Sequence, residues 1–204
     1  MKLFTFTDVH SSLSLIRKLK ERAERERPDV VLCCGDLTIF GMDTEKVIGT
    51  LSQFPMDMVL VHGNHDDDGE IKNLCAKHPT LHFIHGTFFV KDGFIFLGYG
   101  GDGFALEDEQ FKRIEGNLQR ALDQNPGKRA ILVTHAPPYK TKLDALYGGH
   151  CGNNSIRKFI EKNKILFSVC GHIHENFGQV DSIKNTRILN PGPNGKMVTI
   201  EIKK

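Results

Sequence analysis

Three stretches of the sequence share one pattern, a short apolar run followed closely by Asp, Asn or His: LFTFTDVH at residues 3–10, VVLCCGD at 30–36 and MVLVHGNHD at 58–66. The apolar runs predict buried strands at Lys2–Thr7, Val30–Cys34 and Met58–Val61. Amphipathic helical patterns fill both gaps, and the first of them has Ser11 or Ser12 as its cap and Pro28 as its end. This alternation of strands and helices predicts a parallel sheet with crossover helices.

The rest of the chain adds strands, two helices and a tail rich in turns. The further strand candidates are Leu81–Ile84, Phe88–Val90, Phe94–Leu97, Arg129–Thr134 and Ile165–Cys170, and the helix candidates are Leu106–Leu122 and Ile156–Lys162. Turn signals at Lys184-Asn185 and Asn194-Gly195 predict antiparallel hairpins in the tail. We therefore expect an α/β fold in which two mixed β-sheets pack as a sandwich flanked by helices, with residues 1–204 forming a single domain.

Composition excludes several classes of protein. The net charge is +2, and the basic residues between Arg17 and Arg27 alternate with glutamates, so we do not expect a nucleic-acid partner. We expect no membrane partner and a cytoplasmic location, because no apolar run is long enough to span a bilayer and no signal peptide is apparent. The five cysteines lack the spacing of a disulfide framework or a zinc knuckle, which predicts reduced thiols. The sequence leaves a homo-oligomer open.

Polar residues follow five of the predicted strands at the point where each strand ends. They are Asp8, His10, Asp36, Asn64, His65, Asp66, His135, His172 and His174. The carboxyl ends of strands in α/β sheets converge on the ligand crevice, so we expect one shared site at these ends. Gly35 and Gly63 precede two of these residues, where a missing Cβ allows the backbone to approach closely.

Seven of these residues form a mixed set of nitrogen and oxygen ligands: the carboxylates Asp8 and Asp36, the amide of Asn64, and the imidazoles His10, His135, His172 and His174. Such a set suits manganese, iron, cobalt, nickel or zinc, whereas magnesium and calcium prefer more oxygen. Seven groups are too many for one tetrahedral ion but suffice for two ions if one carboxylate bridges them. Two divalent ions, two carboxylates and a hydroxide leave a net charge of about +1, which attracts a phosphate anion.

The motifs resemble those of the calcineurin-like metallophosphoesterase superfamily. Its pattern of D-x-H, G-D, G-N-H-[DE], a single His and G-H-x-H is present in order between residues 8 and 174. The stretch SVCGHIHE at 168–175 and Asn190-Pro191-Gly192 are similar to short prokaryotic members related to cyclic-nucleotide phosphodiesterase.

The resemblance implies a role for each residue. It implies that Asp36 bridges two metal ions. The remaining ligands divide between a first ion, held by Asp8, His10 and His174, and a second ion, held by Asn64, His135 and His172. His65 would contact the substrate, together with Asn64, and would donate a proton to the leaving oxygen or stabilise charge. Asp66 allows two interpretations: either it hydrogen-bonds His65 and raises its pKa, or it caps a helix or is simply solvated.

His150 allows two interpretations. It lies in a glycine-rich stretch, Tyr139–Asn154, that precedes a helix and is the nearest candidate for a lid. A loop that enters a helix N-terminus can bind an anion, so His150 either contacts the substrate or only maintains the loop.

The resulting hypothesis is a phosphoesterase that hydrolyses small phosphodiesters or phosphomonoesters by in-line attack of a hydroxide that bridges two divalent metal ions. Manganese is the first expectation, and iron, nickel, cobalt and zinc are alternatives. The competing hypothesis is a non-catalytic, metal-binding scaffold of the same fold. A nuclease with a capping domain is not expected, because the chain lacks both the inserted domain and the basic contacts for DNA.

Overall fold

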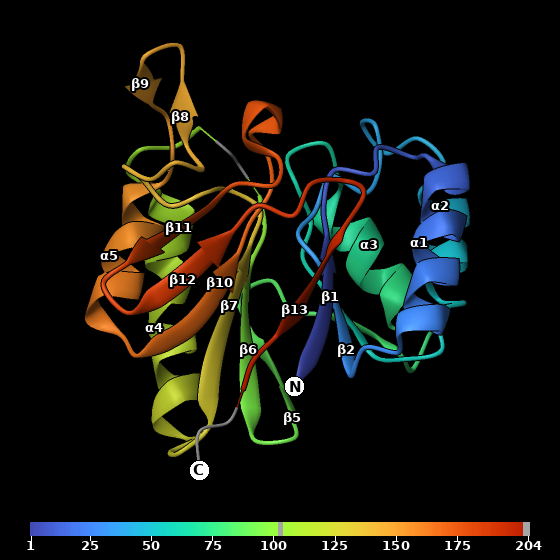
Figure 1. Cartoon of the computed structure of the whole chain (residues 1–204), viewed down its shortest axis with the longest axis horizontal. Helices are drawn as coiled ribbons and strands as arrows, with labels where there is room; N and C mark the ends of the chain where they lie inside the picture. Colours follow the sequence, from blue (N-terminus) through green and yellow to red (C-terminus); the bar gives the residue numbers. More distant parts are fainter. Residues whose placement is uncertain (102–103, 202–204) are drawn as a thin grey trace.

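The computed structural model describes residues 1–101 and 104–201 of the chain. Within these residues the strands form a five-stranded sheet, a six-stranded sheet and a small two-stranded hairpin. The two large sheets lie face to face, and helices cover the outer face of each (Figure 1). Both sheets contain parallel and antiparallel neighbours, so the expected mixed α/β sandwich is confirmed.

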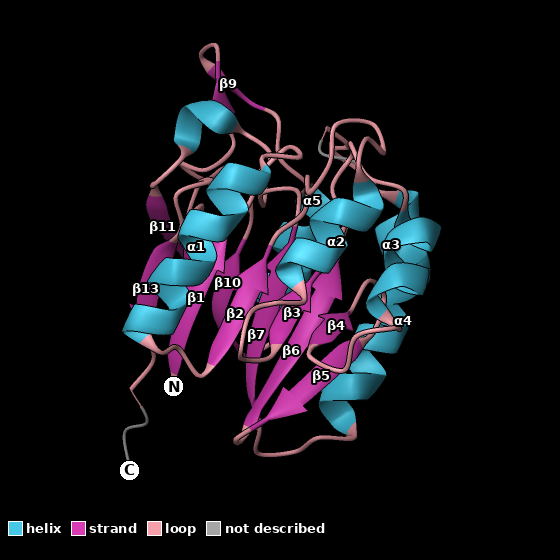
Figure 2. Ribbon diagram, turned by 90° about the vertical axis from the view of Figure 1, so that its right-hand side faces the viewer, coloured by secondary structure: helices cyan, strands magenta, loops and turns pink. Residues whose placement is uncertain are grey.

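The five-stranded sheet contains the strands of the opening motifs. Its order is β13-β1-β2-β3-β4, and the four strands β1 to β4 are parallel. The strands are β1 (Lys2–Phe6), β2 (Val30–Cys33), β3 (Met58–Leu60), β4 (Leu81–Phe83) and the antiparallel edge strand β13 (Lys196–Thr199). Figure 2 shows the helices α1 (Leu13–Glu26), α2 (Thr44–Leu51) and α3 (Asp68–Cys75) side by side over its outer face.

The six-stranded sheet has the order β11-β12-β10-β7-β6-β5, with antiparallel strands at both edges. Its strands are β5 (Phe88–Lys91), β6 (Phe94–Tyr99), β7 (Arg129–Thr134), β10 (Ile165–Val169), β11 (Val180–Ile183) and β12 (Thr186–Leu189). The helices α4 (Glu109–Asp123) and α5 (Asn154–Lys162) cover it. The small hairpin of β8 (Ala145–Leu146) and β9 (Gly149–His150) projects beyond the sheet ends (Figure 1).

The core between the sheets is built from the apolar strand residues that the sequence pattern singles out. Leu32 and Val59 of the five-stranded sheet belong to the same buried cluster as Phe96 and Ile131 of the six-stranded sheet. Full burial of one such side chain stabilises the fold by about 1.5–3 kcal/mol. Two further clusters fill the spaces between the sheets and their helices, one cluster for each sheet. All five cysteines are free thiols, as expected.

Three local expectations differ from the structure. Helix α3 is not predicted by the sequence pattern, because only Ile71 and Cys75 of this short helix are buried and the apolar stripe is faint. Helix α4 begins at Glu109 rather than at Leu106, because the Asp108 carboxylate accepts a hydrogen bond from the backbone N–H of Phe111 and caps the helix there.

The third difference concerns the tail. Lys184-Asn185 does join the antiparallel strands β11 and β12. Asn194-Gly195 does not form a second hairpin, because the chain leaves β12 in one sheet and enters β13 in the other. The turn chemistry was correct, since Gly195 has a φ of +70°, but the pairing partner of β13 is the distant strand β1. Within the described residues, no helix combines the length and apolar character that crossing a bilayer requires.

The junction of the two sheets depends on Gly98 in β6. A Cβ at this position would lie 2.3 Å from the backbone oxygen of Ile84, which follows β4 of the other sheet. We expect Gly98→Ala to lower the free energy of unfolding by about 1–3 kcal/mol, because the two sheets must separate locally. Gly116→Ala is the matched control, since Gly116 lies in α4 with nothing within 4 Å of the added atom.

The control should stabilise the protein by about 0.5–1 kcal/mol, because alanine is the better helix former. Denaturant unfolding of both variants measures the two effects. Equal stability of the two variants would contradict the close approach at Gly98.

Candidate metal centre

The strand ends of both sheets converge on one place. Strands β1, β2 and β3 enter it from the five-stranded sheet, and β7 and β10 enter it from the six-stranded sheet. The residues that follow them are the candidate ligands Asp8, His10, Asp36, Asn64, His135, His172 and His174. Together with His65, several of them line an open cavity of about 300 Å³. The structure therefore brings the residues that the sequence pattern singled out together at one end of the molecule.

The ligand atoms form two groups of three residues. One group contains Asp8, His10 and His174, the other contains Asp8, Asp36 and His135, and the atoms within each group lie within 4.8 Å of one another. Asp36 faces both groups, because its Oδ2 lies 3.8 Å from Nε2 of His10 and its Oδ1 lies 3.5 Å from Nε2 of His135. A carboxylate with one oxygen near His10 and the other near His135 has the geometry that a bridging ligand needs.

Asn64 and His172 complete the second group. Oδ1 of Asn64 lies 3.0 Å from Nε2 of His135. The ring centroids of His135 and His172 are 5.0 Å apart, and Nε2 of His172 is buried without a hydrogen-bond partner among the described residues. Oδ1 of Asp8 is likewise buried without one, although Nε2 of His174 approaches it to 3.4 Å. Buried polar atoms normally have partners, so these two atoms fit a site that is completed by a cation.

Backbone carbonyls orient two of the imidazoles. Nδ1 of His135 lies 2.8 Å from the carbonyl oxygen of Cys34, and Nδ1 of His10 lies 3.4 Å from that of Thr38. An imidazole that donates its Nδ1 proton to a carbonyl keeps Nε2 as the lone-pair nitrogen. Both Nε2 atoms face the candidate centre, so these carbonyls select the tautomer that can bind a metal.

Glycines allow the carboxylates to lie against the backbone. A Cβ on Gly63 would be 2.0 Å from Oδ1 of Asp36, and a Cβ on Gly171 would be 2.6 Å from Oδ2 of Asp8. The freed space admits two hydrogen bonds, from the N–H of His65 to Oδ1 of Asp36 at 3.0 Å and from the N–H of His172 to Oδ2 of Asp8 at 3.2 Å. The expected reason for a glycine at position 63 is confirmed.

Burial sets the charge states of the groups before any cation binds. Burial lowers the pKa of His172 to about 3, with the nearby His135 adding to the effect, so this imidazole is neutral and free to act as a ligand. Burial also raises the pKa of Asp36 above its ordinary value, because the charged carboxylate loses water. Asp36 in its charged form therefore requires a positive partner close by.

Asp66 contacts different groups from those expected. Its carboxylate accepts hydrogen bonds from the backbone N–H groups of Leu37, Thr38 and Gly63 and from the hydroxyl of Thr38. Nδ1 of His65 is buried without a hydrogen-bond partner among the described residues, so the expected hydrogen bond from Asp66 to the His65 ring is wrong. Asp66 instead ties the loop after β3, which carries His65, to the loop after β2, which carries Asp36.

His150 lies on β9 and is not among the residues that line the cavity. Its Nδ1 is 2.9 Å from Oδ1 of Asp144, a carboxylate that is fully buried. Asp144 also accepts hydrogen bonds from the backbone N–H groups of Lys140, Thr141 and Gly152. These contacts favour the interpretation of His150 as a residue that maintains the loop. No motif in the sequence marks Asp144, because its role depends on how the loop folds its backbone N–H groups around the carboxylate.

The sequence analysis also missed exposed aromatic residues at this end of the molecule. The ring of Phe40 lies 4.3 Å from that of His65, and the ring of Phe104 lies 4.3 Å from that of His172. Phe104 and Tyr147 line the cavity. The signal in the sequence that could have revealed these residues is the presence of apolar side chains in predicted loops, as in Ile39-Phe40-Gly41-Met42.

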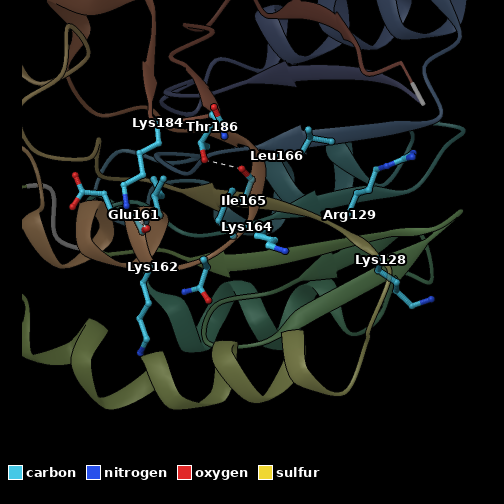
Figure 3. Close-up of a pocket in the computed structure, with 12 residues that line it drawn as sticks. Lys128, Arg129, Glu161, Lys162, Lys164, Ile165, Leu166, Lys184 and Thr186 are labelled. Atoms are coloured by element: carbon cyan, nitrogen blue, oxygen red, sulfur yellow. Dashed lines mark hydrogen bonds between the residues drawn. The ribbon is translucent and has the colours of Figure 1, made fainter. Parts of the chain in front are cut away.

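A larger cavity of about 570 Å³ lies at the opposite ends of β7 and β10 and is lined by basic residues that include Lys128, Lys164 and Lys184 (Figure 3). Lys184 donates a hydrogen bond to the backbone oxygen of Glu161 in the last turn of α5. Cations are favourable at a helix C-terminus, which accounts for part of this basic lining. None of the candidate ligands is among the residues that line this cavity.

Comparisons with known proteins identify a family for this chain. Residues 1–176 match the family model of calcineurin-like phosphoesterases. The uncharacterized protein MJ1162 of Methanocaldococcus jannaschii is 33% identical over 214 residues, which cover 97% of this chain and 91% of that protein. A probable glycerophosphodiester phosphodiesterase, GpdQ of Arcobacter nitrofigilis, is 21% identical over 74% of this chain and 58% of its own length.

The crystal structure of the protein TT1561 of Thermus thermophilus has the same fold. It aligns with a TM-score of 0.80 at 18% sequence identity and covers 95% of this chain and 90% of that one. The family match includes all the strand ends that carry the candidate ligands, from Asp8 to His174. The chain therefore belongs to the calcineurin-like phosphoesterases, a family of metal-dependent enzymes that typically bind two divalent metal ions.

Proposed function

We propose that this protein hydrolyses small phosphate esters with two divalent metal ions held by Asp8, His10, Asp36, Asn64, His135, His172 and His174. The observation that carries this proposal is the position of Asp36, whose two carboxylate oxygens face imidazoles of the two different ligand groups. When bound, a pair of divalent ions lowers the pKa of water and stabilises the charge on the entering and leaving oxygens.

The residues of the chain supply the remaining steps. Hydrolysis forms a P–O bond from water and breaks the P–O bond to the leaving oxygen, which then takes up a proton. His65 is our candidate donor of this proton, because its side chain is one of those that line the cavity beside Asp36 and Asn64. Asp66 is a positioning residue for His65. Its carboxylate joins the backbone of Gly63, two residues before His65, to that of Thr38.

The finer identity rests on resemblance. The chain is similar to short prokaryotic phosphoesterases related to cyclic-nucleotide phosphodiesterase, and the activity in the name of GpdQ supports a phosphodiester as substrate. Manganese is the metal that we propose first, with iron, nickel, cobalt and zinc as alternatives of similar ligand preference. The competing hypothesis, a metal-binding scaffold without turnover, is weakened by the presence of His65 at the cavity.

Removal of metal tests the proposal directly. Protein stripped with a chelator should lose turnover of bis(p-nitrophenyl) phosphate, and added Mn²⁺ or a neighbouring transition metal should restore it, because neither Lys nor Arg is among the described residues that line the candidate site. Release of p-nitrophenol, together with the metal content of each sample, is the measurement. Full turnover by demonstrably metal-free protein would disprove the proposed mechanism, and metal binding without any turnover would favour the scaffold.

The bridging role of Asp36 is separately testable. We expect Asp36→Asn to weaken the binding of both ions and His174→Ala to weaken mainly one, because the carboxylate of Asp36 lies near both His10 and His135, whereas His174 belongs to one ligand group. Elemental analysis of the purified variants gives the number of metal ions per chain. His78→Ala serves as a control and should retain the wild-type content, because His78 lies between α3 and β4 and is not among the residues that line the cavity. Two tightly held ions in Asp36→Asn would show that Asp36 does not bridge.

His65→Ala should retain its metals and lose turnover. We expect kcat to fall by about 10²–10⁴-fold for an ester with a poor leaving group, since such an oxygen needs a proton as it departs. The fall should be smaller for p-nitrophenyl esters, whose leaving oxygen is stable without one. Steady-state kinetics on alkyl and p-nitrophenyl esters measures this difference, and an equal loss for both would indicate that His65 positions the substrate instead.

A further inference from the structure

Exposed apolar side chains gather around the candidate metal centre. Within the described residues, those of large size with high exposure include Ile39, Phe40, Met42, Phe104, Leu106 and Tyr147. All six lie on loops that follow β2, β6 or β7, at the strand ends where the candidate ligands meet. Phe40 is 77% exposed and Tyr147 is 95% exposed, so burial in the core does not explain them.

Phe104 and Tyr147, two of these residues, form an apolar wall of the cavity. Phe104, Leu146, Tyr147 and Ile173 line it together with the polar groups Asp36, Asn64, His65 and His172. Phe104 also packs on the ring of His172 with a centroid distance of 4.3 Å. A phosphate bound at the ligands would therefore place one of its ester groups next to aromatic side chains.

The backbone at Tyr147 supports a role beyond folding. Tyr147 has a φ of +48° and Gly148 a φ of +80°, the conformation of the two central residues of a tight hairpin between β8 and β9. Asn-Gly is the favoured pair at such a turn, whereas a bulky residue with positive φ is strained. A tyrosine here costs stability and gains no burial, which indicates that its exposed ring is used.

The charges at the cavity select the kind of phosphate ester. Among the described residues that line it, Glu175 and Asp36 are acidic and none is Lys or Arg. A phosphomonoester has a second pKa of about 6 and carries close to two negative charges at pH 7. A diester carries one, which is the better match for a site that has acidic residues and no Lys or Arg among the described residues that line it.

We propose that the cavity binds phosphodiesters in which the ester group next to Phe104 and Tyr147 is aromatic or otherwise apolar. The proposal rests on the phosphoesterase function proposed above and names its substrate class. It predicts that the apolar wall discriminates between ester groups of equal charge, a property that the metal centre alone would not have.

Two substrates that share the same leaving group test the role of the apolar wall. Phenyl p-nitrophenyl phosphate and methyl p-nitrophenyl phosphate release the same p-nitrophenol and carry the same charge. We expect the ratio of their kcat/KM values to fall by about fivefold to tenfold in Phe104→Ala and in Tyr147→Asn, because an aromatic contact is lost. Tyr147→Asn suits the turn better than tyrosine does, so this variant should fold. Leu166→Ala, an exposed apolar residue at the far end of the molecule, is the matched control and should keep the wild-type ratio.

Binding measurements separate this proposal from the proposed function. Calorimetric titration of the Mn²⁺-loaded protein should give tighter binding of diphenyl phosphate than of dimethyl phosphate or phenyl phosphate, and Tyr147→Asn should reduce the preference over dimethyl phosphate. If the protein showed this binding preference but no turnover, the result would refute the proposed enzymatic function and would still support the role of the apolar wall.

Two results would overturn the proposal. One is an unchanged kcat/KM ratio in both wall variants of an active enzyme. The other is wild-type protein that self-associates in sedimentation experiments and variants that dissociate with an unchanged ratio, which would make the apolar surface an interface between copies of the chain.

Discussion

Two buried carboxylates at the meeting point of both sheets, Asp8 and Asp36, constrain the rest of the structure. They are 4% and 2% exposed, and a buried charge costs several kcal/mol unless it is paired and hydrogen-bonded. Backbone N–H groups from the loops after β10 and β3 satisfy one oxygen of each, and glycines at positions 171 and 63 make room for them. The remaining oxygens face imidazoles, so the fold is arranged around positive charge that the chain itself does not supply in full.

A second set of buried or half-buried carboxylates positions the loops that surround the centre. Asp66 ties the loop after β2 to that after β3, Asp144 organises the segment that leads to the β8–β9 hairpin, and Asp108 caps α4 behind Phe104. Each accepts at least one backbone N–H group that would otherwise lack a partner. The loops are therefore held by the same chemistry as the candidate ligands, although none of these three residues is a candidate metal ligand in the geometry observed.

Local sequence predicted the site better than it predicted the contacts within it. The apolar runs before Asp8, Asp36 and Asn64 placed these residues at strand ends, and the 28-residue steps between them correspond to one strand and one crossover helix each. The partner of Asp66 could not be predicted, because its backbone donors at 37 and 38 are distant in sequence and become neighbours only through the pairing of β2 with β3. The partner of β13 could not be predicted either, because it is also distant in sequence. A turn signal defines a reversal of the chain but not the sheet that the next strand joins.

Burial explains the aromatic residues of the core but not the exposed aromatic residues near the cavity. A phenylalanine such as Phe96 stabilises the fold through burial, whereas Phe40 and Tyr147 adopt positive φ values of +48° and remain exposed. A left-handed conformation costs a non-glycine residue about 1–2 kcal/mol, and side chains as exposed as these two gain little burial to offset that cost. Both loops are nevertheless fixed, through Asp66 and Asp144, so the rings are presented at defined positions beside the cavity. A metal centre alone attracts any phosphate anion, and discrimination among esters of equal charge must come from side chains placed in this way.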